Sequence, residues 1–159
     1  MPTTIRPATA SDAESIGRLV AEFQGYLRSL GDRTEFDFGA VAYLRDGFGS
    51  DSAFAGFVAE SGRTVVGYAL YHFGYDTDRG RRIMHLVDLY VQDAWRQKGI
   101  GKQLMQCLAE VGRAREVEFI VWSLFKPNAL ARRFYEQLGA TYLTTLDFMA
   151  LDIRDRRPE

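Results

Sequence analysis

The sequence predicts a mixed α/β fold (an α+β arrangement) with a central, twisted, mostly antiparallel sheet flanked by helices. Stretches of helical apolar spacing lie on both sides of a middle region rich in valine, tyrosine and phenylalanine, a composition typical of strands. The chain has 159 residues, of which 47% are hydrophobic and 26% charged, so it can bury the core of one domain. We expect a single domain over residues 1–153 and a charged, frayed tail over 154–159.

The first part of the chain predicts a short strand followed by two helices. Residues 5–8 read as the strand, which contains a proline near its end. Ser11 and Asp12 supply helix-capping chemistry, and apolar residues then recur at helical spacing to about Leu30. A second, weaker helix is predicted over 38–44, and the glycine-containing run 46–49 ends that pattern.

The middle and the end of the chain predict most of the sheet. Strands over 54–60, 64–75 and 82–91 are separated by polar turns, which favours an antiparallel meander. The remaining elements are a helix over 99–115, a strand over 118–124, a helix over 128–138, and candidate closing strands over 141–144 and 148–153. This alternation of strands and helices favours a mixed sheet.

Charge and cysteine content argue against several classes of partner. Twenty lysines and arginines against 21 acidic residues give a net charge of −1, which removes the main electrostatic argument for a nucleic-acid or anionic-membrane partner. Cys107 alone cannot form an intrachain disulfide, and with two histidines it is too little for a structural zinc site, so we expect no metal. The start of the chain has no signal-peptide pattern, and the longest uncharged stretch, 64–75, is too short for a membrane span, so we expect a cytoplasmic protein.

The most informative stretch is the predicted strand 86–91, followed by the turn 96–102, which opens a helix. Gly99 and Gly101 allow the backbone of this turn to approach a ligand closely. Free N–H groups at a helix start attract anions. On the residues alone, an anion site and a turn with only a folding role are equally good interpretations.

Two common phosphate-binding motifs do not fit this turn. A P-loop needs serine or threonine after its lysine, and Gln103 follows Lys102 here. A dinucleotide-binding fingerprint needs a third glycine, and Leu104 occupies that position. An anion site in this turn would therefore belong to another class.

The run from Arg96 to Gly101 resembles the Arg/Gln-x-x-Gly-x-Gly/Ala signature of the GCN5-related N-acetyltransferases, the GNAT family, in which the turn holds the pyrophosphate of acetyl-CoA. Four further pieces resemble that family's segments in the same order: the opening strand at 5–9, the third strand at 65–69, the fourth strand at 88–91, and the late helix, with Asn128, Phe134-Tyr135 and 138–140. The resemblance covers nearly the whole chain.

The resemblance implies an acyl-CoA N-acyltransferase fold and direct attack of an amine on the thioester of acetyl-CoA, without an acyl-enzyme. It also implies a homodimer with the amine site near the subunit interface. The cofactor-binding residues that it implies are Leu89, Tyr90, Val91, Arg96, Gln97, Lys98, Gly99, Ile100, Gly101, Lys102 and Asn128. For Asn128, capping of its helix and a hydrogen bond to the pantetheine arm are both open, and the two are compatible.

Within the family, the segments 46–49, 58–60 and 71–76 resemble the spermidine/spermine (diamine) N-acetyltransferase branch. Two positions depart from that branch. Its substrate-contacting glutamate falls at Val87, and a second acidic substrate contact falls at Leu27. Since both carboxylates are replaced by apolar residues, a polyamine acceptor is less well supported than the family itself. The substrate-site candidates are Tyr26, Leu27, Val87 and Asp88.

Catalysis requires an acid for the leaving thiolate and a base for the amine. Tyr135 is the candidate acid, because a phenol is protonated at neutral pH, and its alternative role is that of a buried helix aromatic. His85 shares strand parity with Val87 and is the candidate base, whereas Asp88 has the opposite parity and is expected to be structural. Cys107 is expected to be a small, core-facing hydrophobe. Other candidates for the base are His72, Tyr26 and Glu22.

The leading hypothesis is an acetyl-CoA-dependent N-acetyltransferase acting on a small primary amine, which is a diamine, a lysine-like amino acid or another metabolite. One alternative is a non-catalytic sensor that binds acyl-CoA. A second is a protein acetyltransferase that modifies lysine side chains or N-termini.

Overall fold

The structure is a computed structural model, and it describes residues 2–154. Its strands are β1 (Thr3–Pro7), β2 (Ala55–Ser61), β3 (Thr64–Asp76), β4 (Arg81–Val91) and β5 (Val117–Val121). Its α-helices are α1 (Ala13–Ser29), α2 (Ala40–Gly47), α3 (Ile100–Ala114) and α4 (Ala129–Gln137). Two short 3-10 helices, η1 (Ala10–Asp12) and η2 (Asp93–Trp95), precede α1 and α3. None of the helices in the described chain is long and apolar enough to cross a bilayer.

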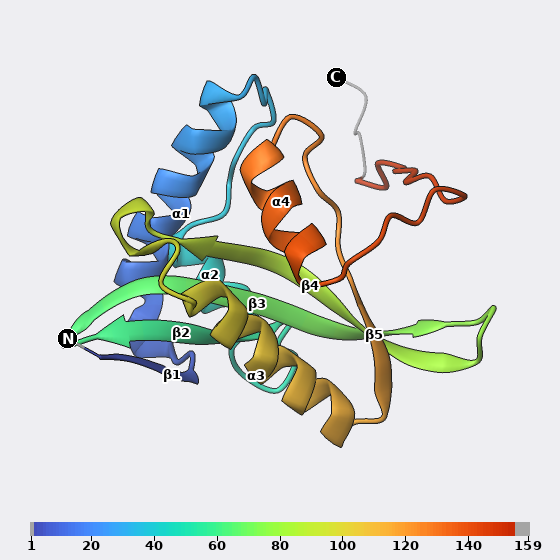
Figure 1. The fold of residues 1–159 in the computed structure, drawn as a ribbon, viewed down its shortest axis with the longest axis horizontal. Helices are drawn as coiled ribbons and strands as arrows, with labels where there is room; N and C mark the ends of the chain where they lie inside the picture. Colours follow the sequence, from blue (N-terminus) through green and yellow to red (C-terminus); the bar gives the residue numbers. More distant parts are fainter. Residues whose placement is uncertain (1, 155–159) are drawn as a thin grey trace.

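The five strands form one sheet in the order β1-β2-β3-β4-β5. The first three neighbouring pairs are antiparallel, and β5 runs parallel to β4. In Figure 1, α3 crosses one face of the sheet while α1 lies behind it, and the β3–β4 hairpin extends beyond both helices. The mixed, mostly antiparallel sheet flanked by helices confirms the predicted fold class.

Apolar residues fill the space on each face of the sheet. On the α3 side, Leu104 and Leu108 pack with Met84 and other strand residues. On the α1 side, Ile16 and Leu19 pack with strand residues and with Tyr43 of α2. Strand β3 lies between these two clusters, which explains its nearly continuous apolar run.

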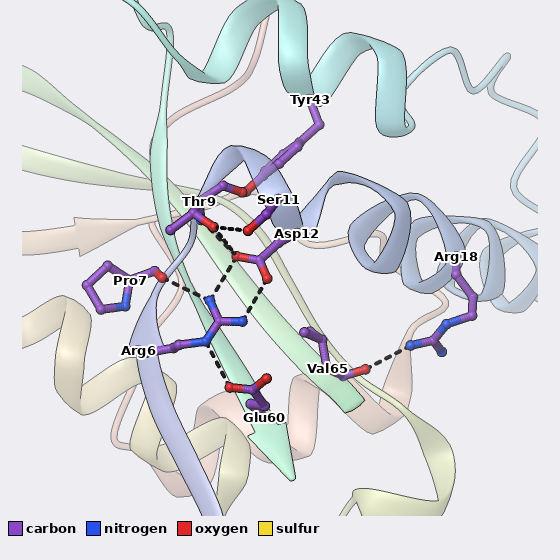
Figure 2. A network of polar contacts seen from close by, with 9 residues as sticks. All are labelled: Arg6, Pro7, Thr9, Ser11, Asp12, Arg18, Tyr43, Glu60 and Val65. Atoms are coloured by element: carbon purple, nitrogen blue, oxygen red, sulfur yellow. Dashed lines mark hydrogen bonds and ion pairs between the residues drawn. The ribbon is translucent and has the colours of Figure 1, made fainter. Parts of the chain in front are cut away.

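A network of ion pairs joins β1 to its neighbours (Figure 2). Nη2 and Nη1 of Arg6 donate to the two carboxylate oxygens of Asp12 at 2.8 and 2.9 Å, and its Nε donates to Glu60 at 2.9 Å. The main-chain N–H of Thr9 donates to Asp12 at 2.8 Å, and the hydroxyl of Tyr43 donates to the carbonyl of Thr9. These contacts hold β1, η1, α2 and β2 together at one corner of the fold.

The predicted closing strands are wrong for the described chain. Residues 141–144 and 148–153 form no strand, although β5 is the edge of the sheet. Their alternating apolar pattern favours an extended backbone, but a strand also needs a partner edge, and within residues 2–154 they pair with none. The predicted tail lies outside the described residues from 155 onward.

Candidate active site

Strands β4 and β5 separate partway along their length. They pair only between Arg82–His85 and Val117–Val121, while β4 continues to Val91. The edge of β4 beyond His85 therefore has no partner strand in the described chain, and its main-chain groups there are available to a ligand. A cavity of about 930 Å³ lies at this opening, bounded by α1, β4, the turn before α3, the start of α3, and α4.

Most of the predicted site residues line this cavity. They are Tyr26, Leu27, Val87, Asp88, Leu89, Tyr90, Val91, Arg96, Gln97, Gly99, Ile100, Gly101, Lys102, Asn128 and Tyr135. Two predicted residues do not line it. Lys98 places its ammonium 4.6 Å from the centre of the Trp95 ring, and His85 stacks on His72 with ring centres 4.9 Å apart.

A β-bulge at Val87 changes which side chains of β4 face each side of the sheet. Leu86 pairs with Tyr71 and Asp88 pairs with Leu70, so Val87 has no partner on β3. Parity predicts that Asp88 points away from the face of His85, and the bulge makes that prediction wrong. After the bulge, Asp88 points to the α1 side of the sheet, where it contacts Tyr68.

The environment of His85 does not favour a role at the cavity. Burial, and secondarily the charge of His72, lower the pKa of His85. Its ring is occupied by the stack on the hairpin, away from the lining residues. The structure does not bring His85 together with Tyr135.

Different features of the structure require glycine at the two positions of the turn. Gly99 caps α3 with φ of +79°, a left-handed conformation that glycine adopts without strain. Gly101 packs so closely against α4 that a Cβ at this position would lie 3.0 Å from the Phe134 ring. No side chain caps the start of α3, so its first N–H groups are free to bind an anion.

Arg96 is held at the cavity wall by two aromatic rings. Its guanidinium lies 5.4 Å from the ring centres of both Tyr26 and Tyr90, and its Nε donates to the carbonyl of Val91 at 2.9 Å. These contacts fix the path of the chain from β4 into the turn. Arg96 also pairs with the exposed Asp93.

Asn128 is buried and caps α4. Its Oδ1 accepts hydrogen bonds from the N–H of Ala131 and the hydroxyl of Tyr26, both at 3.2 Å. Both contacts use the oxygen, so the side-chain NH₂ is the group available to a ligand. The capping role predicted for Asn128 is confirmed, and it leaves the second predicted role open.

Tyr90, Tyr135 and Asp88 are the groups lining the cavity whose pKa values are raised chiefly by burial. Burial, and then the negative charge of Asp88, raise the pKa of Tyr135 well above its usual value, so its hydroxyl stays protonated at neutral pH. Burial raises the pKa of Asp88 to about 6, although hydrogen bonds from Tyr68 and the N–H of Leu89 oppose the shift. The ring of Tyr135 packs on Trp122 with centres 4.6 Å apart. The cavity thus contains a proton donor and a carboxylate that is ionised near neutral pH.

The structure corrects the expectation for Cys107. Its side chain is partly exposed and lies outside both apolar clusters and the cavity. The buried positions of α3 are Ile100, Leu104, Leu108 and Gly112, so Cys107 lies beside that face and not on it. Within the described residues, no group of His, Cys, Asp and Glu is arranged to hold a metal ion.

Comparison with known proteins agrees with the geometry of the turn and the cavity. The sequence model of the Acetyltransferase (GNAT) family matches residues 19–140, which is most of the chain. This chain belongs to the GNAT family. It is accordingly an N-acetyltransferase, and acetyl-CoA is the co-substrate of GNAT acetyltransferases.

Two relatives belong to the branch that the sequence resembles. Thialysine N-epsilon-acetyltransferase of Bos taurus is 34% identical over 148 residues, covering 88% of this chain and 85% of the relative. Spermidine/spermine N(1)-acetyltransferase-like protein 1 of Homo sapiens is 31% identical over 148 residues, which cover 89% of this chain and 21% of that longer protein.

Solved structures of low sequence identity share the GNAT fold. An integron cassette protein of V. cholerae superposes with a TM-score of 0.78 at 24% identity, covering 96% of this chain and 93% of its own. Ribosomal-protein-alanine N-acetyltransferase from Brucella melitensis biovar Abortus 2308 gives 0.69 at 22% identity, covering 97% and 100%.

The sequence did not reveal several cavity residues of this GNAT chain. Phe23 of α1 and Trp122, just after β5, line the cavity, and Tyr68 binds Asp88 from β3. No local motif marks these positions, because each is an apolar or aromatic residue at a spacing that a core residue would also have. The bulge at Val87 also has no sequence signal such as a glycine.

Proposed function

We propose that this GNAT enzyme transfers the acetyl group of acetyl-CoA to the primary amine of a small molecule, either a diamine or a lysine-like amino acid. The observation that carries the proposal is one cavity that the start of α3, Tyr135 and Asp88 all line. The relatives named for thialysine and for spermidine/spermine support an aliphatic amine acceptor.

We infer that acetyl-CoA would bind along the free edge of β4 and the start of α3. The N–H groups near Gly99 and Gly101 would hold the pyrophosphate, and Arg96 and Lys102 would add positive charge. A main-chain N–H between Leu89 and Val91 would donate to the thioester carbonyl, which favours the negative charge that develops there.

Tyr135 would act as the general acid of this reaction. Its hydroxyl is protonated at neutral pH and lines the cavity, so it can donate a proton to the departing sulfur. Packing on Trp122 would fix the ring orientation.

The apolar wall at the acceptor end favours short acceptors. Val87 is 47% exposed and Leu27 also lines the cavity, so neither offers a charge to the distal ammonium groups of a polyamine. We therefore expect lysine-like amino acids and short diamines to exceed spermidine and spermine in kcat/KM.

A thiol-release assay with a panel of amines tests this function. Lysine, thialysine, 1,4-diaminobutane, spermidine and a lysine-containing peptide would each be supplied with acetyl-CoA, and calorimetry would measure acetyl-CoA binding separately. We expect micromolar binding and turnover on a short amine. Binding without turnover on any of these acceptors would contradict the proposed reaction, and turnover on the peptide alone would favour a protein acetyltransferase.

Gly99→Asp is the matched test of the cofactor site. It places bulk and negative charge at the start of α3 and should abolish acetyl-CoA binding, whereas Gly62→Asp, at another positive-φ turn remote from the cavity, should leave binding unchanged. Intact binding in Gly99→Asp would remove the turn from the cofactor site.

The proposed homodimer is supported by the apolar surface of the last described segment. The following large apolar side chains of residues 141–153 are exposed: Tyr142, Leu143, Leu146, Phe148, Met149, Leu151 and Ile153. A group of exposed apolar side chains like this one usually contacts another molecule. A second copy of the chain, with its own residues 141–153 packed near the edge strand β5, would cover it.

Light scattering tests the dimer directly. The wild-type chain should elute with twice the monomer mass, and Phe148→Asp should shift it toward the monomer. Val41→Asp is the matched control, because Val41 is equally exposed but lies on α2. A wild-type mass of one chain at micromolar concentration would contradict this proposal.

A further inference from the structure

Asp88 is a half-buried carboxylate with no cation beside it. Across residues 2–154, no lysine, arginine or histidine nitrogen lies within 4.0 Å of it. Its hydrogen-bond donors are neutral: the hydroxyl of Tyr68 at 2.5 Å and the N–H of Leu89. A carboxylate that is largely shielded from water is normally paired with a cation, and Asp88 has only neutral donors, so a cationic ligand could supply the missing partner.

The position of Asp88 makes such a partner reachable. Asp88 lines the cavity, and among the described lining residues it is the only acidic one. It lies beside the unpaired Val87 of the bulge, where β4 has no strand on its free edge. Tyr135 lines the same cavity, and the negative charge of Asp88 helps to raise its pKa. Both groups can therefore contact a ligand in this cavity.

We propose that Asp88 binds the ammonium group of the acceptor and takes its proton, which makes it the general base of the acetyl transfer. This inference rests on the proposed function. Glu22, a candidate base in the sequence, is engaged instead with Arg18 and Gln92 and does not line the cavity. His85 also lies outside it.

The protons and bonds of this step balance. One N–H proton of the ammonium moves to a carboxylate oxygen of Asp88, and the freed lone pair forms a C–N bond to the acetyl carbonyl carbon. The C–S bond breaks, and the sulfur takes the hydroxyl proton of Tyr135. The nitrogen, now becoming an amide, gives up a second proton that restores the hydroxyl of Tyr135. The proton on Asp88 leaves to solvent, so each turnover releases one proton.

Tyr68 is the positioning residue for this carboxylate. It is fully buried in β3, and its hydroxyl donates to Oδ2 of Asp88 at 2.5 Å, which holds that oxygen in place. The titratable groups around Asp88 are the phenols Tyr68, Tyr90 and Tyr135, each with a raised pKa, and they stay neutral where a carboxyl titrates. The nearest charged groups beyond these phenols are Glu22 of α1 and Arg96, both of which contact Tyr90.

Asp88→Asn tests the proposal, with Asp12→Asn as the matched control. Asp88→Asn should lower kcat/KM for the best amine by about 100-fold or more, the range of general-base catalysis, with acetyl-CoA affinity within about twofold of wild type. The loss should be smaller for an analogue fluorinated beside the amine, because that amine is largely neutral already. Asp12→Asn should keep wild-type turnover per folded molecule, since Asp12 lies at the β1 corner.

Tyr68→Phe tests the positioning residue. Because the hydrogen bond from Tyr68 lowers the pKa of Asp88, its loss should move the acidic limb of the pH profile to higher pH.

Binding of 1,4-diaminobutane, measured by calorimetry in the presence of coenzyme A, separates this proposal from the proposed function. Wild type should bind the diamine at least tenfold more tightly than Asp88→Asn. Equal diamine binding by the two proteins, or no binding to wild type, would overturn the role of Asp88 while leaving acetyl-CoA binding intact. Turnover of Asp88→Asn within threefold of wild type, or equal losses on the amine and its fluorinated analogue, would overturn its role as base.

Discussion

Asp12, which is buried, and Asp88, which is half-buried, are two carboxylates of this chain with opposite surroundings. Asp12, with 5% of its side chain exposed, receives two hydrogen bonds from the guanidinium of Arg6 and another from the N–H of Thr9 (Figure 2). Asp88 receives only neutral donors, chiefly the hydroxyl of Tyr68. Within residues 2–154 the fold supplies a cation to the first carboxylate and none to the second.

The pKa shifts of the two carboxylates have opposite signs. Burial would raise the pKa of Asp12, but hydrogen bonds from Arg6 and Thr9 outweigh it and lower the pKa below its usual value. Burial dominates at Asp88 and raises its pKa to about 6. Asp12 therefore stabilises the folded state near neutral pH and loses that effect in acid, whereas ionised Asp88 destabilises it. The proposed role of Asp88 in the reaction would explain why this destabilising carboxylate is present.

Tyr135→Phe should have the largest effect, and it concerns the Asp88 side of the comparison. Removing the hydroxyl removes the proposed acid, so kcat should fall by about 100- to 10,000-fold with acetyl-CoA affinity nearly unchanged. Steady-state kinetics and calorimetry measure the two quantities. Tyr142→Phe is the control, because Tyr142 is exposed and outside the cavity. Unchanged turnover in Tyr135→Phe would remove Tyr135 from the mechanism.

Arg6→Met should have the next largest effect, on stability alone. It leaves the buried Asp12 and the half-buried Glu60 without their cation, and because Arg6 is itself half-buried the cost should be about 2 kcal/mol, between that of an exposed and that of a buried pair. Urea denaturation at pH 7 gives the free energy of unfolding. Arg18→Met, which removes a more exposed pair with Glu22, should cost only about 1 kcal/mol. If Arg6→Met lowered the free energy of unfolding no more than Arg18→Met does, the Arg6 ion pairs would not stabilise Asp12 as expected.

Asp88→Asn should stabilise the protein while it lowers activity. The raised pKa means that folded Asp88 binds its proton more tightly than unfolded Asp88, so wild-type stability falls as pH rises from about 4 to about 6. A shift from 3.8 to about 6 corresponds to roughly 3 kcal/mol, and the asparagine variant should recover about 1–2 kcal/mol of it above pH 6. Thermal unfolding between pH 4 and pH 8 measures the gap, which should vanish near pH 4. Asp12→Asn should show the reverse, a loss that disappears in acid.

The sequence predicts the helices and strands of this fold better than it predicts the direction and the partner of Asp88. Helical and strand periodicities, and the glycines of the turn before α3, are local signals, and they lead to the correct helices and to β1–β5. The direction of Asp88 depends on a bulge at Val87 that only pairing with β3 reveals, so strand parity gave the wrong face. The partner of Asp88, Tyr68, lies 20 positions earlier, and residues 141–153 find no strand partner within residues 2–154, which periodicity could not show.

The smallest expected effects come from two residues with strained backbones. Gln97 at the cavity and Glu116 in the turn before β5 both have positive φ, at +60° and +58°. Glycine at either position relieves a left-handed conformation that costs a side chain about 1 kcal/mol, so each variant should gain about 0.5 kcal/mol after the added unfolded-state entropy. Calorimetry should show weaker acetyl-CoA binding for Gln97→Gly alone, because Gln97 lines the cavity and Glu116 does not. Equal affinities in the two variants would mean that the strain at Gln97, like that at Glu116, serves only the path of the chain.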